Sequence, residues 1–314
     1  MPESKTENID FYDYLYKLLQ QIPEGFVTTY GALASALGDI RASRAVGTML
    51  SENESGDIYP CYKVVYSNGE VGNYTHPLDP AEKKRRLEAD GVKISRNRIE
   101  NFERSLFSDF KTDYPLRKLA SMQDEMKSRV SLEDDLNGES IGAVDVSYEG
   151  RTGYGVFIWQ NGNKLNKKEV VMSSNFPYIP GYLAFREYKF IKELCYDFDG
   201  TLLVDGNGIL HPRGVGLATY AGLKLNIPTI GVAKSLLMGK VRENNVYLEE
   251  KKVAVVLSSN SIVSPGNRIS LNTAVKIVRS DSAGTYPKIL KLVHDETVSL
   301  RKNNLLHAEE NGAT

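Results

Sequence analysis

Residues 201–208 read TLLVDGNG, an apolar run that ends in an aspartate and a glycine-containing turn. A short apolar run bounded by turn residues is typical of a buried strand, so we expect a strand over Thr201–Asp205. Apolar residues at helical spacing lie before it, over residues 182–196, and after it, over residues 214–225. Another strand is expected over Thr229–Ala233. This alternation predicts parallel strands joined by helices.

Strands of another kind are expected upstream of this region. They cover Ile141–Tyr148, Gly153–Trp159 and Glu169–Ser173, with short turns between them. Three antiparallel strands followed by strand–helix units predict an α/β domain with a mixed sheet and helices on both faces. The remaining elements expected in this half are a strand over Val253–Leu257 and helices over about 271–280 and 286–302.

The first third of the chain is organised differently. Helical spacing covers residues 8–22, and two short helices over about 30–37 and 42–51 are separated by a turn that begins at Gly38. Two short helices joined in this way are typical of a helix-turn-helix. The elements expected after them are strands over Tyr62–Tyr66 and Val71–Tyr74 and a helix that begins at Asp79 and ends near Gly91.

The 314 residues are enough for two domains, and we place them at 1–98 and 114–314 with a charged linker at 99–113. The two cysteines lie in different domains, which predicts a reducing compartment. The polar start and the lack of an apolar run of roughly 18 residues indicate a cytoplasmic protein with no membrane contact. Because the net charge is -1, DNA contacts would have to come from basic patches. The candidate patches are Arg41 with Arg44 and the run Lys83, Lys84, Arg85 and Arg86, which can also be a solvated helix face.

Three acids are candidates for a metal site. Asp145 lies on the first expected strand of the second half, Asp205 ends the strand at 201–205, and Glu187 lies on the helix between them. If these two strands are neighbours, the aspartates meet, and such oxygen ligands suit Mg²⁺ or Mn²⁺. Judged from spacing alone, two turn aspartates and a surface glutamate explain the pattern better, because pairs of acids are frequent.

Three segments, in the same order as in the family, resemble endonuclease V, the nuclease of deaminated bases: residues 177–187, 204–213 and 227–235. The resemblance covers roughly residues 110–300 and implies an RNase H-like fold. It also implies hydrolysis of the second phosphodiester bond on the 3′ side of a hypoxanthine. In that reaction Asp145 and Asp205 would hold Mg²⁺, or Mn²⁺, and Glu187 would be the third acid. The base would flip out of the helix, at least cost where its pairing is weak.

The same resemblance implies roles for further residues. His211 and Lys234 would lie near the phosphate. A rigid wedge that parts the strands would consist of Pro177, Tyr178, Ile179 and Pro180. A pocket for the flipped base would include Gly181, Leu183, Gly206 and Gly208. The chain departs from the family at Asn267, where a histidine is usual.

Cys61 lies in the stretch YPCYKVV at residues 59–65. A lone cysteine is more often an inert buried residue. Here residues 25–34, 44–47 and 71–74, together with the Pro60-Cys61 pair, resemble the DNA-binding domain of O6-alkylguanine-DNA alkyltransferases. The resemblance implies that Cys61 accepts the alkyl group. The resemblance also implies roles for four other residues. Arg44 would be the finger that fills the gap left by the flipped guanine, and Tyr30 would press on the flanking phosphate. Tyr74 would lie beside the guanine, and Asn53 would support the turn that carries Cys61.

Two departures bear on thiol activation. The family follows its cysteine with histidine and arginine, whereas this chain has Tyr62 and Lys63, and the usual glutamate is Asp90. The thiolate is the nucleophile, and a tyrosine with a pKa of about 10 is a poor base. Tyr62 and Asp90 would relay a hydrogen bond, or Lys63 would favour the thiolate. The first domain is then either a working alkyltransferase or a non-catalytic sensor of alkylated DNA.

The sequence therefore predicts a bifunctional DNA repair protein whose partner is DNA with deaminated or O6-alkylated bases and which shows no obligate protein partner. Two alternatives stay open. The nuclease half would act on inosine in RNA, or the chain would be a helix-turn-helix regulator whose nuclease-like half only binds nucleic acid.

Overall fold

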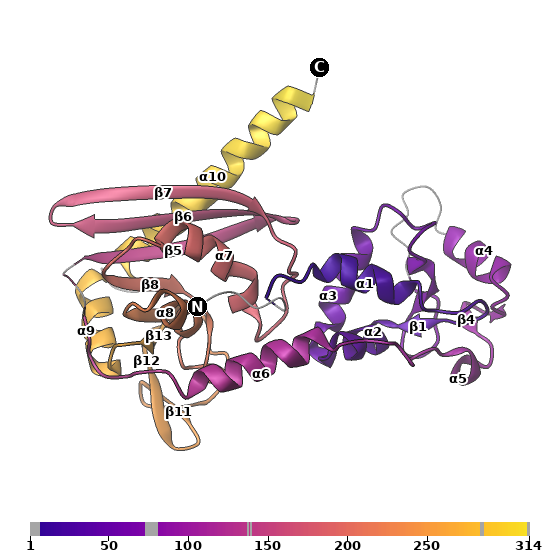
Figure 1. Cartoon of the computed structure of the whole chain (residues 1–314), viewed down its shortest axis with the longest axis horizontal. Coiled ribbons are helices and arrows are strands. Elements are labelled where there is room, and N and C mark those ends of the chain that lie inside the picture. Colours follow the sequence, from indigo (N-terminus) through magenta and orange to yellow (C-terminus); the bar gives the residue numbers. More distant parts are fainter. Residues whose placement is uncertain (1–6, 73–80, 137, 139, 283–285, 313–314) are drawn as a thin grey trace. The chain divides into compact units, whose positions relative to one another are not determined.

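The computed structural model describes residues 7–72, 81–136, 138, 140–282 and 286–312, the last six without their side chains. The chain divides into two compact units. One consists of Ala120–Ser174 and Gly181–Thr314, and the other consists of Pro2–Leu119 together with the short segment Asn175–Pro180. Within the described residues, no helix has the length and apolar character needed to cross a membrane. Figure 1 labels helices and strands of each unit.

The unit that contains the N-terminal residues is built on α1 (Phe11–Leu19), α2 (Tyr30–Leu37) and α3 (Ser43–Ser51). Thr29 begins α2 because its hydroxyl accepts a hydrogen bond from the backbone N–H three residues later. Gly38 ends this helix with a φ of 109°, a left-handed conformation that glycine adopts without steric cost. The predicted pair of short helices is confirmed.

The segment around Cys61 differs from the expected strand over Tyr62–Tyr66. The chain forms a 3₁₀ turn, η2 (Cys61–Lys63), and only then the short strand β2 (Val64–Val65), which pairs in parallel with β1 (Thr28–Thr29). The turn forms because local backbone hydrogen bonds replace strand pairing, and the Cys61 N–H donates to the carbonyl of Tyr59 at 2.7 Å. Of the expected strand over Val71–Tyr74, residues 73 and 74 lie outside the described residues.

Residues 99–113 are tied to the same unit by backbone hydrogen bonds. Val27 donates to the carbonyl of Ser105 at 2.8 Å and accepts from the N–H of Phe107 at 2.7 Å. The other elements in this part of the unit are α4 (Glu82–Ala89), β3 (Ile94–Ser95), β4 (Arg98–Ile99) and α5 (Phe102–Ser105). Buried apolar side chains join them to β1 and β2, among them Val65, Leu87 and Ile99.

The larger unit is organised around a nine-stranded mixed sheet with the strand order β10-β11-β12-β13-β9-β8-β5-β6-β7. The strands are β5 (Ile141–Glu149), β6 (Thr152–Asn161), β7 (Lys164–Ser173), β8 (Thr201–Asp205), β9 (Thr229–Ala233), β10 (Lys240–Arg242), β11 (Asn245–Leu248), β12 (Lys251–Ser258) and β13 (Ser261–Asn267). The first three are antiparallel, and β8 pairs in parallel with both β5 and β9. The expected mixed, RNase H-like arrangement is confirmed. The sequence analysis missed β10, β11 and β13.

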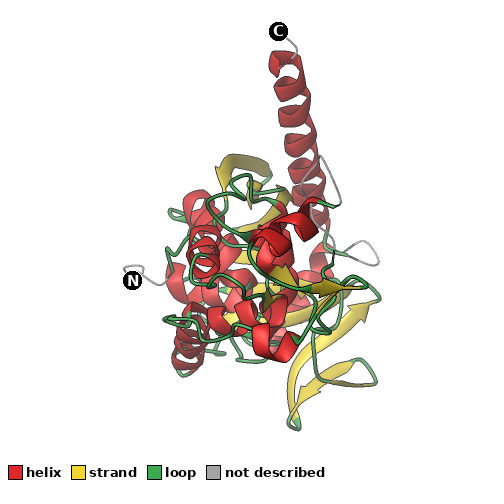
Figure 2. Cartoon of the chain, turned by 90° about the vertical axis from the view of Figure 1, so that its right-hand side faces the viewer, coloured by secondary structure: helices red, strands yellow, loops and turns green. Residues whose placement is uncertain are grey.

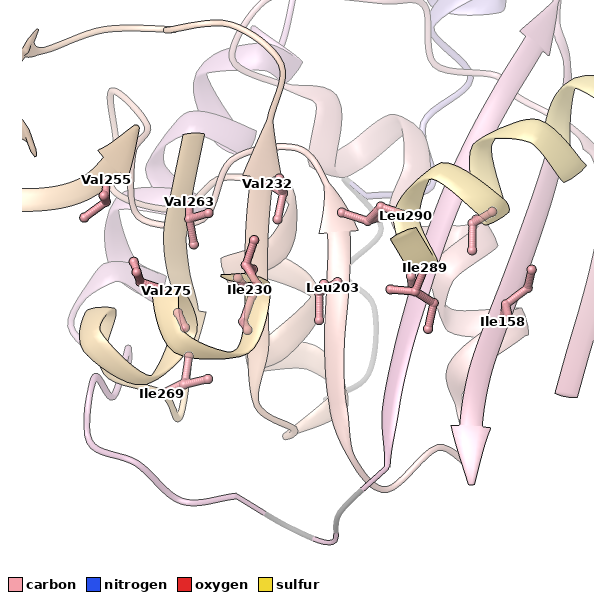
Figure 3. Close-up of a cluster of buried hydrophobic side chains, with 14 of the residues drawn as sticks. Ile158, Leu203, Ile230, Val232, Val255, Val263, Ile269, Val275, Ile289 and Leu290 are labelled. Atoms are coloured by element: carbon pink, nitrogen blue, oxygen red, sulfur yellow. The ribbon is translucent and has the colours of Figure 1, made fainter. Parts of the chain in front are cut away.

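Helices cover both faces of this sheet. On one face, α9 (Leu271–Asp281) and α10 (Lys288–Gly312) enclose an apolar core that includes Ile158 and Leu203 (Figure 3). On the opposite face lie α7 (Leu183–Cys195) and α8 (Leu217–Leu225). A further helix, α6 (Pro115–Lys127), leads into this unit, and Figure 2 shows that the end of α10 extends well beyond the sheet.

The turn after β8 is held by close backbone packing. A methyl group on Gly231 would lie 2.2 Å from the nitrogen of Gly208 and 2.6 Å from the carbonyl oxygen of Gly206. A methyl group on Gly208 would lie 2.1 Å from the carbonyl oxygen of Pro265. Backbone atoms in a sheet cannot move away as a side chain can, so glycine at these positions is required to set the path of the chain after Asp205.

We therefore expect Gly231→Ala to lower the free energy of unfolding by about 3 kcal/mol or more, because overpacking against backbone cannot relax. The control is Gly206→Ala, whose added methyl group would meet only the Leu217 side chain at 3.4 Å. Urea denaturation of both variants measures the difference. Equal unfolding midpoints for the two variants would show that the backbone at this turn is free to adjust.

Candidate metal centre and candidate thiol site

The parallel pairing of β5 and β8 brings two acids together. The register places Val144 beside Val204, so the next residues, Asp145 and Asp205, lie at the same end of adjacent strands. One donor atom from each aspartate and one from His294 lie within 4.8 Å of one another. The prediction that these strands are neighbours is confirmed.

His294 is the residue that the sequence analysis missed. It lies on α10, and its Nδ1 is 2.8 Å from Oδ2 of Asp145, the partner to which it donates in this arrangement. One turn later, the hydroxyl of Thr297 donates to the carbonyl of His294 at 2.8 Å and lies 3.5 Å from the same carboxylate oxygen. The sequence predicted a helix over about 286–302. It gave no sign that a residue of this helix contacts an aspartate 149 positions earlier.

The acids repel each other in this setting. Burial raises the pKa of Glu187 well above its usual value, and the charges of Asp145 and Asp205 raise it further. Burial likewise raises the pKa of Asp205, and the charge of Asp145 adds to the shift. Glu187 lies outside the set of three donors but shares their electrostatic environment. A cation at this point would relieve the repulsion.

The donor set fits a divalent metal. The two carboxylates suit Mg²⁺ and Mn²⁺, the imidazole beside them is a ligand typical of transition-metal ions, and each donor side chain remains partly exposed. Lys234 neutralises Asp205 here, with Nζ 2.5 Å from Oδ2. The ring of Tyr286 lies 5.6 Å from the same ammonium, and burial followed by the charges of Asp205 and Asp145 raises the pKa of this phenol. Tyr286 is a second residue that the sequence analysis did not find.

His211 has a structural contact in place of a metal contact. Its ring Nε2 lies 3.2 Å from the carbonyl oxygen of Gly181, and its Nδ1 accepts from the N–H of Arg213 at 3.2 Å. The guanidinium of Arg213 donates to the same carbonyl of Gly181. His211 therefore holds the segment that precedes α7, where Gly181 has a φ of 82°. Leu183 begins that helix.

The other residues expected near the substrate are arranged as follows. Tyr178 is 58% exposed, while Pro177 and Ile179 on either side of it are buried, so the ring projects from an anchored loop. Pro180 is exposed.

Asn267, at the family's usual histidine position, is buried, accepts from the N–H of Ser131 and donates to the carbonyl of Gly222. Asn267 therefore ties backbone segments together and lies outside the donor set.

The candidate thiol lies on the turn η2, and Cys61 is partly exposed. Asn53 donates from its side chain to the carbonyl of Tyr59 at 2.9 Å and so holds the turn that leads to Cys61. Burial raises the pKa of Tyr30, and the charges of Tyr66 and Cys61 add to the shift. Arg44 is exposed on α3. Tyr74 lies outside the described residues.

Asp90 is the centre of a buried polar network. The ammonium of Lys63 lies 2.8 Å from Oδ2 of Asp90 and also donates to the carbonyls of Ile22 and Pro23. The hydroxyl of Tyr62 donates to Oδ1 of Asp90 at 3.4 Å. Burial, followed by the charge of Asp90, raises the pKa of Tyr62 above its usual value, which makes this phenol a still poorer base.

Lys83 is buried, whereas its position in a run of basic residues suggested a solvated helix face. Its side chain on α4 is buried, and Nζ donates to the carbonyl of Val64 at 2.7 Å. Burial lowers the pKa of Lys83 to about 8, an effect that the charge of Cys61 opposes. The chain therefore has a buried amine that interacts electrostatically with the candidate nucleophile. The sequence gave no signal for this arrangement, because Lys83 stands in a run of four basic residues.

Comparisons with known proteins match both halves. A family model for Endonuclease V matches residues 124–294, and one for the 6-O-methylguanine DNA methyltransferase DNA binding domain matches residues 10–92. A bifunctional methyltransferase/endonuclease from Picrophilus torridus is 48% identical over 96% of this chain and 100% of that protein.

Solved structures share the fold of the larger unit. Endonuclease V from Streptomyces avermitilis is 23% identical with a TM-score of 0.55, covering 60% of this chain and 94% of that one. Endonuclease V from Ciona intestinalis, in complex with DNA containing an inosine, is 23% identical with a TM-score of 0.50, covering 61% of this chain and 99% of that one.

We expect His294→Ala to weaken Mn²⁺ binding at least about tenfold, the lower end of losses at metal sites, while His211→Ala leaves the affinity nearly unchanged. The reason is that His294 contacts Asp145, whereas His211 contacts backbone. Isothermal titration of the full chain with Mn²⁺ in the absence of DNA makes the comparison. A larger loss for His211→Ala would mean that the ion binds elsewhere.

Proposed function

The chain belongs to the family of bifunctional methyltransferase/endonucleases, and we propose that it nicks DNA beside hypoxanthine and transfers alkyl groups from O6-alkylguanine to Cys61. The observation that supports the nuclease half most directly is the convergence of Asp145, Asp205 and His294 beside the buried Glu187. Family membership argues against a regulator that only binds nucleic acid.

The nuclease half hydrolyses a phosphodiester bond. Asp145, Asp205 and His294 would hold Mg²⁺, or Mn²⁺ in its place, which supplies Lewis acidity toward the phosphate and makes a water more acidic. Glu187 takes up a proton from the attacking water, in keeping with its raised pKa. The water oxygen bonds to phosphorus, the bond from phosphorus to the 3′ oxygen breaks, and that oxygen takes up a proton from solvent. The products are a 3′-hydroxyl and a 5′-phosphate. Lys234 leaves Asp205 and pairs with the phosphate charge.

Substrate choice rests on the segment before α7. The exposed ring of Tyr178 stacks where a base leaves the helix, and the loop between Pro177 and Pro180 keeps the strands apart. Gly181, held by His211, allows the backbone to come close to the flipped base, together with Leu183, Gly206 and Gly208. Hypoxanthine pairs weakly, so flipping it costs less than flipping a paired base. The Ciona intestinalis relative bound to inosine-containing DNA supports this choice.

The thiol half forms a carbon–sulfur bond. The thiolate of Cys61 bonds to the alkyl carbon, the bond from that carbon to O6 breaks, and the guanine keeps the electron pair and takes up a proton. The charge of Lys63 is already taken by Asp90, and the raised pKa of Tyr62 makes this residue a poor base. Lys83 instead supplies the positive charge that favours the thiolate.

The nuclease proposal is tested with an inosine-containing duplex and Mg²⁺. We expect Asp145→Ala to abolish nicking, because the ion loses a ligand, and to leave alkyl transfer unchanged. Cys61→Ala should have the reverse effect. Gel analysis of the nicked strand and transfer of labelled alkyl groups to protein measure the two activities.

The same two assays distinguish the proposed functions from their alternatives. If the wild-type chain takes no label but binds alkylated DNA, the first domain is a sensor. If matched inosine-containing RNA is cut faster than DNA, RNA is the substrate of the nuclease. Loss of both activities in Asp145→Ala would contradict two independent sites.

The role of Lys83 gives a pH signature. We expect Lys83→Met to slow alkyl transfer at pH 7 roughly tenfold, the effect of about 1.4 kcal/mol of lost charge interaction. Because Lys83 loses its own charge as the pH rises through about 8, the gap between wild type and variant should close above that pH. Lys84→Met is the matched control on the neighbouring, less buried position. A constant ratio from pH 6 to pH 9 would contradict the role.

A further inference from the structure

A cavity of about 830 Å³ lies in the larger unit, on the side of the β8 turn that carries His211 and Pro212. Its remaining walls are the end of α6 with the segment after it and the ribbon formed by β10, β11 and β12. We call it the ribbon pocket. Its volume falls in the range of about 300–1,000 Å³ found for ligand sites. Apart from His211, none of its lining residues has a role in the proposed hydrolysis or alkyl transfer.

Basic side chains surround this pocket. Five of its lining residues are lysine or arginine and two are glutamate. Arg242 is paired with Glu250 at 2.7 Å and lies over the ring of Tyr247. The side chains of the four lysines, by contrast, make no hydrogen bond or ion pair within the part of the chain that the structure describes. They are Lys127, Lys240, Lys251 and Lys252. Such a group of unpaired cations favours an anionic ligand.

The pocket also has an apolar side. Its lining includes Val130, Leu132, Ile209, Pro212 and Leu248, and the exposed fraction of Leu132 is 43%. An inorganic anion would make no favourable contact with such an apolar surface, and a metal ion would be repelled by the lysines. A polynucleotide matches both features, because its phosphates are anionic and its base faces are apolar.

His211 connects the ribbon pocket to the candidate metal centre. It lines the pocket, and it lies six residues after Asp205 on the same turn. A strand held with its scissile phosphate at Asp145 and Asp205 would therefore continue along this turn toward the pocket. Nothing in the hydrolysis itself requires the lysines of the ribbon, so their role would be to hold the strand.

We propose that the ribbon pocket binds an unpaired segment of the substrate strand, with lysines on the phosphates and a base against the apolar side. This proposal rests on the proposed nuclease function and adds to it a second point of contact. It predicts that affinity for single-stranded DNA depends on these lysines even where the DNA contains no damaged base.

The test uses the full chain without added metal, so that no cutting occurs. Binding of a fluorescent single-stranded DNA of ordinary bases is followed by anisotropy at several salt concentrations. The double variant Lys240→Ala with Lys252→Ala should bind about tenfold more weakly, and the slope of log affinity against log salt should fall by about 1.4, the loss of two phosphate contacts. Lys164→Ala with Lys276→Ala, at exposed positions elsewhere on this unit, should match the wild type within twofold.

A third variant examines the apolar side. Leu132→Ser should weaken binding and leave the salt slope unchanged, because stacking involves no counterion release. Equal affinity and equal slope in wild type and lysine variant would overturn the proposal, as would equal losses in both lysine pairs. If heparin and DNA lose affinity alike and Leu132→Ser has no effect, the pocket is a general anion site and the base contact is rejected. Nicking of inosine DNA by wild type separates these results from a failure of the proposed function.

Discussion

The parallel pairing of β5 with β8 is the constraint on which the larger unit depends. It places two aspartates at the ends of adjacent strands, and burial on both sides denies them the solvation that would otherwise offset their repulsion. Two helices complete this cluster. Helix α10 places His294 beside Asp145, and α7 places Glu187 near both aspartates. Close packing among Gly206, Gly208 and Gly231 fixes the turn that follows Asp205.

In the smaller unit, the proposed alkyl transfer requires that the thiol of Cys61 be activated. The side chains that the sequence suggested for this task are occupied elsewhere, since Lys63 and Tyr62 both contact Asp90. In the proposed function, the buried amine of Lys83 takes this role. The two proposed functions therefore use opposite charges, because the acids would bind a cation in one unit and a lysine would favour a thiolate in the other.

Patterns along the chain predicted the parts that depend on local spacing. Apolar runs identified the strands that carry Asp145 and Asp205, and a glycine at the end of α2 identified the helix pair. His294 could not be found in this way, because its partner lies 149 residues earlier and only tertiary packing brings them together. Lys83 was misjudged because burial of one member of a basic run leaves no trace in composition. The strand β13 was missed because Pro265 and Gly266 are unusual within a strand.

The central claim is that Asp145, Asp205 and His294 bind one divalent ion. The most direct measurement is a crystal grown with Mn²⁺ and examined by anomalous scattering at the manganese edge. The account predicts a peak with both carboxylates roughly 2.0–2.6 Å away and the imidazole as a further ligand. A peak coordinated by other side chains, or no peak at these residues with Mn²⁺ in excess, would contradict it.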